Sequence, residues 1–264
     1  MKHQNRYDIF IDKLTQEFAQ ITNFNLIQED KKGKEIFNFI VKRFGEIHSF
    51  KTLFTNYYIL AASKSVIDDA NEIQKSKYKH LLVISKEDLK ENYYETIRLG
   101  YIGMFHKYEN YVNDVIVNAE LLISELNETS TSLTKYIELT FNYKIKDWKN
   151  SSSINRLNWI TICNKHYDGF PKKEPKHVSY IHLPENEKIK LTKEDFIQDI
   201  DILIKHYNLI LQIVFTLALY KTTFDGKDFT INEFTDLELH QKIIDGKNQM
   251  HEQALKLIEL SKEF

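Results

Sequence analysis

The segment SKEDLKENYYETIRLGYIGMFHKYENYVNDVIVNAELL, residues 85–122, decides the fold class of this chain. Its apolar side chains recur every three or four positions, which is the spacing of a helix with one buried face. These residues are Leu89, Tyr93, Ile97, Tyr101, Met104, Tyr108, Tyr111, Val112, Val115 and Leu122. Ser85 and Asp88 form a capping-box pattern at its start. The segment therefore predicts one long helix against which other helices pack.

The composition favours an all-α protein. The chain has 7 glycines and 3 prolines in 264 residues, which is too few turn residues for a sheet of many strands. All three prolines lie between residues 168 and 191. We expect an irregular loop insert there, with a short extended piece over 178–183.

Helical spacing is present on both sides of the central segment. It predicts helices over 9–21, 36–47, 50–70, 131–147, 153–167 and 192–220, and a last one from Asn232 or Thr235 to about 260. We expect three parts. They are an N-terminal helical layer (1–84), a helical bundle that contains the loop insert (85–222), and a C-terminal helix (223–264).

Charge and cysteine content exclude several classes of protein. With 36 Lys and Arg against 38 Asp and Glu, the net charge of −2 argues against a general nucleic-acid coat. The single cysteine, Cys163, excludes an internal disulfide and fits a cytoplasmic protein. The uncharged run that begins at Tyr207 has 14 residues, which is short of a membrane span. We expect no membrane and no cofactor.

The stretch INRLNWITICNKHYDGFP, residues 154–171, carries the most chemistry. An apolar helix ends there in Asn164, Lys165 and His166, before a glycine and a proline. An imidazole can accept and donate a proton near neutral pH, and a helix end beside a loop gives it access to solvent. The plainer interpretation is a capped helix end whose histidine is hydrogen-bonded, followed by solvated lysines.

Three segments together resemble the HEPN superfamily. They are RLGYIGMFHKYENYVNDVI (98–116), the helix that ends in NKHYDGFP (164–171), and EDFIQDIDILIKHYNLILQIVF (194–215). HEPN proteins are small all-α bundles of prokaryotic toxins, phage-defence proteins and CRISPR-linked ribonucleases. The resemblance covers roughly 86–222 and implies a HEPN-like bundle with helical extensions at both ends.

The resemblance also implies an activity, which is RNA cleavage by a homodimer without metal. In active members an arginine holds the scissile phosphate and a histidine assists attack by the 2′-OH. Carried onto this chain, the expected catalytic residues are His166, Asn164 and Arg156. The expected RNA-binding residues are Lys165, Arg98, Lys172 and Lys173.

In the family, four to six residues separate the arginine from the histidine, and this pattern is not met before His166. The nearest arginine, Arg156, lies ten residues before His166, which is about 15 Å along a helix. Arg43 and His48 do have the family spacing and form an alternative site. The missing arginine motivates a second hypothesis. In it the chain is a non-catalytic interaction or sensor module that binds a protein partner, such as an antitoxin, or a small nucleotide, and signals to a separate effector protein.

Two further arrangements of residues are weaker candidates. Cys163 and His166 stand at i and i+3 of one helix, which gives only a loose nucleophile–base pair with no oxyanion donor in view. His106 and Glu109 also stand at i and i+3. Metal-binding bundles need a His and a Glu at this spacing on two helices, but this sequence has only one copy. We therefore expect no metal.

Overall fold

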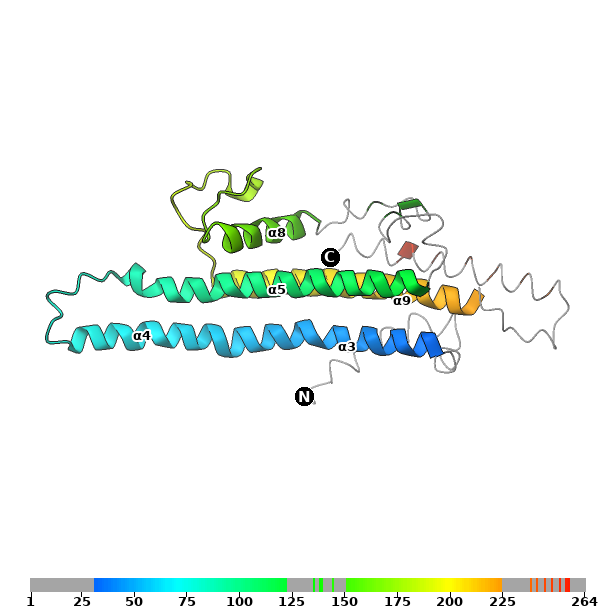
Figure 1. Ribbon diagram of the computed structural model, residues 1–264, viewed down its shortest axis with the longest axis horizontal. Coiled ribbons are helices and arrows are strands. Elements are labelled where there is room, and N and C mark those ends of the chain that lie inside the picture. The colour runs from blue at the N-terminus through cyan, green and yellow to red at the C-terminus, as the bar shows by residue number, and fades with distance from the viewer. Residues whose placement is uncertain are drawn as a thin grey trace. The chain divides into compact units, whose positions relative to one another are not determined.

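The computed structural model describes residues 31–122 and 151–224, and single residues elsewhere such as Lys135 and Gln241. Its elements are α3 (Lys31–Leu53), η1 (Phe54–Tyr58), α4 (Ile59–Lys75), α5 (Lys86–Leu122), α8 (Ser151–His166), η3 (Val178–Tyr180) and α9 (Lys193–Phe224) (Figure 1). Both ranges contain helices and no strand, so the predicted all-α class is confirmed. The expected helix over 9–21 lies outside the described residues, as do most residues of those over 131–147 and 232–260.

Two capping boxes fix where the long helices begin. At α5 the Ser85 amide donates to Asp88 Oδ2 at 2.8 Å, and the Asp88 amide donates to Ser85 Oγ at 3.1 Å. At α9 the amide of Thr192 and that of Asp195 make the same exchange at 2.8 and 3.1 Å. Aspartate thus replaces the usual glutamate of the motif, and both predicted starts are confirmed.

The helices expected over 36–47 and 50–70 form one continuous helical segment. A π-helical turn, η1, joins α3 to α4 without a break. Such a turn inserts an extra residue and changes which side chains face inward. Here Phe54 packs against Phe50 and Tyr58, with ring centroids 5.0 and 5.1 Å apart.

The chain divides into two compact units, each made of separate segments. Unit 1 contains Met1–Gly45, Asn110–Ser151 and Lys205–Phe264, and unit 2 contains Glu46–Glu109 and Ser152–Ile204. The three sequence parts proposed above, 1–84, 85–222 and 223–264, stay a prediction.

In the described residues of unit 1, helices meet around aromatic rings. The Tyr111 ring of α5 lies 6.0 Å from that of Tyr207 on α9. The Arg43 guanidinium stacks 4.7 Å from the Tyr111 ring centre and pairs with Asp114 at 2.6 Å. Arg43, an alternative arginine for RNA, is therefore already engaged by a carboxylate.

Unit 2 places the first half of α5 and the start of α9 between two helical layers. The end of α3 with α4 lies on one side, and α8 with its loop lies on the other (Figure 1). Its core is closed by fully buried side chains from all of these helices. They are Ile47, Ile59, Ile97, Tyr101, Met104, Leu157, Ile160, Cys163, Phe196, Ile200 and Leu203.

Gly100 of α5 allows the aromatic rings of this core to meet. A Cβ at Gly100 would stand 2.8 Å from Phe54 Cε1 and 2.9 Å from Phe196 Cε2. Those two rings are themselves packed with centroids 5.6 Å apart. The absence of a side chain at Gly100 therefore brings α5 close to both neighbouring helices.

The loop insert begins as expected. Asp168 and Gly169 adopt positive φ angles of 54° and 81°, and the Gly169 amide donates to the Cys163 carbonyl at 3.1 Å, closing the end of α8. The extended piece predicted over 178–183 is wrong. The His177 side chain accepts a hydrogen bond from the Ser179 amide at 3.2 Å and initiates the 3₁₀ turn η3 instead.

None of the described helices combines the length and apolar content that crossing a bilayer requires.

Alanine at Gly100 is expected to lower the thermal midpoint. Overpacking of a core by an added carbon costs about 1–3 kcal/mol, which exceeds the gain of about 1 kcal/mol in helix propensity. Gly103→Ala is the matched control, because its Cβ would meet only the tip of the half-exposed Phe50 ring, at 2.9 Å. Circular dichroism melts would contradict this packing if the two variants were equally stable.

Candidate functional site

The C-terminal end of α8 exposes the polar residues that the sequence singled out. Lys165, His166, Tyr167 and Asp168 are all exposed, and His166 is the last residue of the helix. Cys163, one turn earlier, is fully buried, and burial raises the pKa of its thiol. The two side chains therefore occupy opposite environments and do not form a Cys–His dyad.

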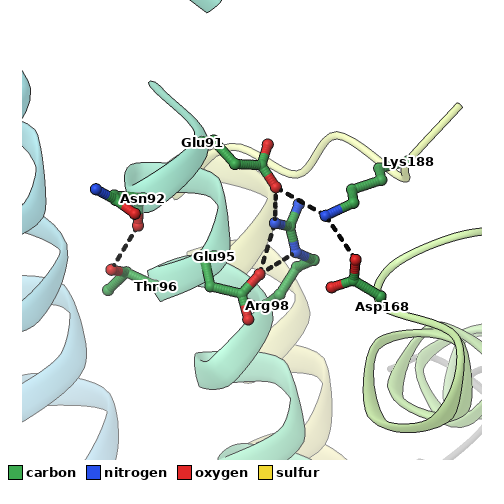
Figure 2. Close-up of polar contacts among 7 residues, drawn as sticks. All are labelled: Glu91, Asn92, Glu95, Thr96, Arg98, Asp168 and Lys188. Carbon is green, nitrogen blue, oxygen red and sulfur yellow. Dashed lines mark hydrogen bonds and ion pairs between the residues drawn. The ribbon is translucent and has the colours of Figure 1, made fainter. Parts of the chain in front are cut away.

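Arg98 lies in an ion-pair network beside this helix end (Figure 2). Its side chain is only 3% exposed. It donates to Glu91 Oε1 at 2.5 Å, and twice to Glu95 Oε2, at 2.8 and 2.6 Å. The two acids come from the preceding turns of α5, so α5 itself neutralises this arginine.

Lys188 extends the network to the loop insert. Its ammonium group stands 3.0 Å from Glu91 Oε1 and 2.9 Å from Asp168 Oδ2 (Figure 2). Burial acts to raise the pKa of Glu91, but the hydrogen bonds from Lys188 and Arg98 outweigh it and hold that pKa below its ordinary value. The network thus ties both ends of the loop to α5.

Arg156 is the centre of a second polar cluster, in the layer between α8 and α9. It forms an ion pair with Asp199, whose side chain is 3% exposed, and donates to the Tyr180 hydroxyl at 3.3 Å. The Tyr101 hydroxyl donates to the other oxygen of Asp199 at 2.6 Å. One buried carboxylate therefore holds residues of α5 and α8 together.

Burial and hydrogen bonding oppose each other at Asp199. Burial raises the pKa of its carboxyl, and the Tyr101 hydroxyl and the Arg156 guanidinium act to lower it, with a net increase. Burial also raises the pKa of Tyr101 well above its usual range, and the charge of Asp199 adds to this. A buried carboxylate with these two donors requires Arg156 as its counter-charge.

Aromatic stacking covers the outer side of this cluster. The Trp159 and Tyr180 rings stack with centroids 5.1 Å apart, and the Trp159 indole donates to the Lys173 carbonyl at 2.8 Å. Burial and the nearby charge of Arg156 lower the pKa of His177. Of the loop lysines expected to bind RNA, Lys172 is exposed and lies over the Phe170 ring, whereas Lys173 is half-buried.

Asn164 is buried, with 8% of its surface exposed. It lies on the side of α8 that faces α5, one turn after Thr161, whose hydroxyl reaches the Tyr101 carbonyl. Neither its amide nitrogen nor its carbonyl oxygen has a hydrogen-bond partner among the described residues. This predicted catalytic residue is therefore withdrawn from the solvent that surrounds His166.

The structure brings the expected site residues into three separate environments. His166 and Lys165 are exposed, Arg98 belongs to the Glu91 network, and Arg156 belongs to the Asp199 cluster. In residues 31–122 and 151–224, no hydrogen bond or ion pair connects His166 to either arginine. The same residues contain no group of three His, Cys, Asp or Glu side chains suited to a metal ion.

Sequence reasoning did not include the acids that hold these arginines. Asp199 lies three residues after Phe196 and four before Leu203, on the buried stripe of α9. An acid at a core position of a helical pattern signals a buried partner of opposite charge. Its identity as Arg156, 43 residues away, depends on the fold.

No family model, no curated protein and no solved structure matches this chain.

Removing the Asp199 carboxylate is expected to destabilise the protein by about 3–5 kcal/mol, because Arg156 would then remain as an unpaired, mostly buried charge. Asp201→Ala is the control on the same helix. Asp201 pairs with Lys51 and is 43% exposed, so its loss should cost about 1 kcal/mol or less. Equal losses for Asp199→Ala and Asp201→Ala in urea unfolding would show that the buried pair has no special weight.

Leucine at position 164 is expected to stabilise the protein. It has a similar shape and removes a buried amide without partners, whose burial costs about 1–3 kcal/mol. Asn155→Leu, at an exposed position of the same helix, should leave the midpoint unchanged. A lower midpoint for Asn164→Leu would indicate that the amide makes a stabilising contact.

Proposed function

We propose that this chain is a non-catalytic all-α interaction module of a prokaryotic phage-defence or toxin–antitoxin system. It binds a protein partner, an antitoxin or a separate effector, and does not cut RNA. One observation supports this proposal above all others. Each arginine offered for a phosphate, Arg98 or Arg156, is already paired with carboxylates.

The charge around Arg98 is unfavourable for an RNA phosphate. Arg98 and Lys188 provide two positive charges, against three negative charges from Glu91, Glu95 and Asp168. A phosphate would have to displace a carboxylate from an arginine that is almost fully buried. The carboxylates around Arg98 would also repel a phosphate directly, because like charges disfavour binding.

Arg156 is unavailable to a phosphate for a different reason. Its partner Asp199 is buried and also accepts from Tyr101, so the ion pair belongs to the packing of α8 on α5 and α9. Moving Arg156 toward a ligand would open that layer. Both arginines therefore support the fold of unit 2. This agrees with a binding module, because neither guanidinium is left to stabilise a cleaving transition state.

The exposed end of α8 provides a surface for such a partner. Lys165, His166 and Lys172 are exposed there, next to the exposed ring of Tyr167. Positive charge beside an aromatic ring suits an acidic protein segment, because charge guides the encounter and the ring adds apolar contact.

A metal-independent endoribonuclease is the second candidate, and the exposure of His166 favours it. RNA carries its own nucleophile, the 2′-OH, so an enzyme of this kind needs only a proton acceptor and a cation. In that case His166 is the acid–base group, Lys165 replaces the family arginine at the phosphate, and two copies form the site.

Bacterial expression of the wild type and His166→Ala separates the two candidates. The binding module predicts equal growth and intact cellular RNA in both strains. His182→Ala, an exposed histidine in the loop insert, is the matched control. RNA cleavage by the wild type and by His182→Ala, lost in His166→Ala, would overturn the proposal in favour of the ribonuclease.

A further inference from the structure

An exposed apolar surface extends over α4 and the loop that follows it; we name residues 57–86 the α4–loop surface. On the helix it includes Tyr57, Leu60 and Ile67, which is 59% exposed. In the loop four consecutive aliphatic residues, 81–84, are exposed, and Val83 reaches 96%. Monomeric proteins rarely expose so many large apolar side chains together, and such surfaces mark sites of association.

The two halves of the α4–loop surface carry opposite charges. The helix half, residues 59–74, has Asp68, Asp69 and Glu72 against a single lysine, Lys64, for a formal charge of −2. The loop half, residues 75–86, has four lysines and no acid, for a formal charge of +4. These lysines are Lys75, Lys77, Lys79 and Lys86, all exposed.

These charges are not neutralised inside unit 2. Among the described residues no ion pair involves Asp68, Asp69, Glu72 or any of the four loop lysines. The closest interaction of a loop lysine is that of Lys77, whose ammonium lies 4.9 Å from the Tyr78 ring centre. Both halves are thus available to a partner.

The loop leaves the end of α4 and turns back toward the start of α5 (Figure 1). In the described residues of one molecule, no ion pair joins the acidic, apolar helix half to the basic, apolar loop half. A second molecule related by a two-fold axis brings each half onto the opposite half. Such a pairing forms a closed dimer, in which each acidic half faces a basic half.

We propose that a second copy of this chain covers the α4–loop surface, with the loop of each copy lying on α4 of the other. In this antiparallel arrangement Lys77 and Lys79 meet Asp68 and Glu72 of the other copy, and the aliphatic residues 81–84 cover Ile67. This proposal concerns a surface separate from the end of α8 and does not depend on whether the chain binds an effector or cuts RNA.

Other occupants fit only one half of the surface. An acidic protein would match the loop lysines but would face like charge at Asp68, Asp69 and Glu72. An anionic bilayer would attract the loop, yet the same three acids would oppose closer approach of α4. A copy of the chain carries both complementary charges, so it is the occupant that the charge pattern favours.

Charge reversal on each half provides the test. Variant A is Lys77→Glu with Lys79→Glu, and variant B is Asp68→Lys with Glu72→Lys. The wild type should be a dimer by light scattering and sedimentation at low salt, and each variant alone should dimerise at least about tenfold more weakly, because like charges then face each other. An equimolar mixture of A and B should recover the dimer, since each new charge then meets its opposite.

A control variant tests whether the loss of dimer is specific to the α4–loop surface. Glu185→Lys with Glu187→Lys reverses two exposed charges of the loop insert, away from the α4–loop surface, and should leave the dimer unchanged. A monomeric wild type overturns the proposal, and its sedimentation with phosphatidylserine vesicles would assign the surface to a membrane instead. A dimer that persists in A and B, or one that their mixture does not restore, also overturns it. These experiments measure dimerisation and vesicle binding, not RNA cleavage. The proposed function is therefore tested separately, by the expression of His166→Ala.

Discussion

The ion pair between Arg156 and Asp199 is the interaction on which the rest of unit 2 depends. Asp199 is buried, accepts from Tyr101 and pairs with Arg156, so a single carboxylate connects α9 to α5 and α8. A buried carboxylate is stable only with such partners. The same ion pair neutralises the positive charge of Arg156, which a phosphate would need. Fold and function are therefore linked through one side chain, because the charge that stabilises this layer is no longer available for chemistry.

Arg98 follows the same principle at the other end of the layer. Its carboxylates come from its own helix, and Lys188 links them to Asp168 at the start of the loop insert. The loop is thus held at the end of α8, with His166 outside the network and exposed. A histidine at a helix end is compatible with acid–base chemistry or with a binding surface. The charges around it favour binding, since no guanidinium in the described part of the chain is joined to it.

Local features of the fold could be predicted from the sequence. Ser85 and Thr192 begin helices through contacts with residues three positions away, and Gly169 ends one through its own backbone conformation. The π-turn at Phe54 could not, because Phe54 packs on Phe196, which is distant in the sequence. The 3₁₀ turn at Val178 begins with a local contact of the His177 side chain, a signal that apolar spacing alone does not include. The site was predicted in part. The exposure of His166 follows from its place at a helix end, whereas Arg98 and Arg156 meet acids whose positions only the fold determines.

Carboxylates hold Arg98 and Arg156, and we infer that this pairing excludes a phosphate from both. Nitrogen-15 NMR of the arginine Nε–H groups tests it most directly, through their hydrogen exchange and their shifts when single-stranded RNA is added. We expect slow exchange of the Arg98 Nε–H, because it is buried and donates to Glu95, and no shift of either arginine signal when RNA is added. Fast exchange at Arg98, or a shift of either arginine signal that saturates as RNA is added, would contradict it and return that arginine to a role in binding the RNA backbone.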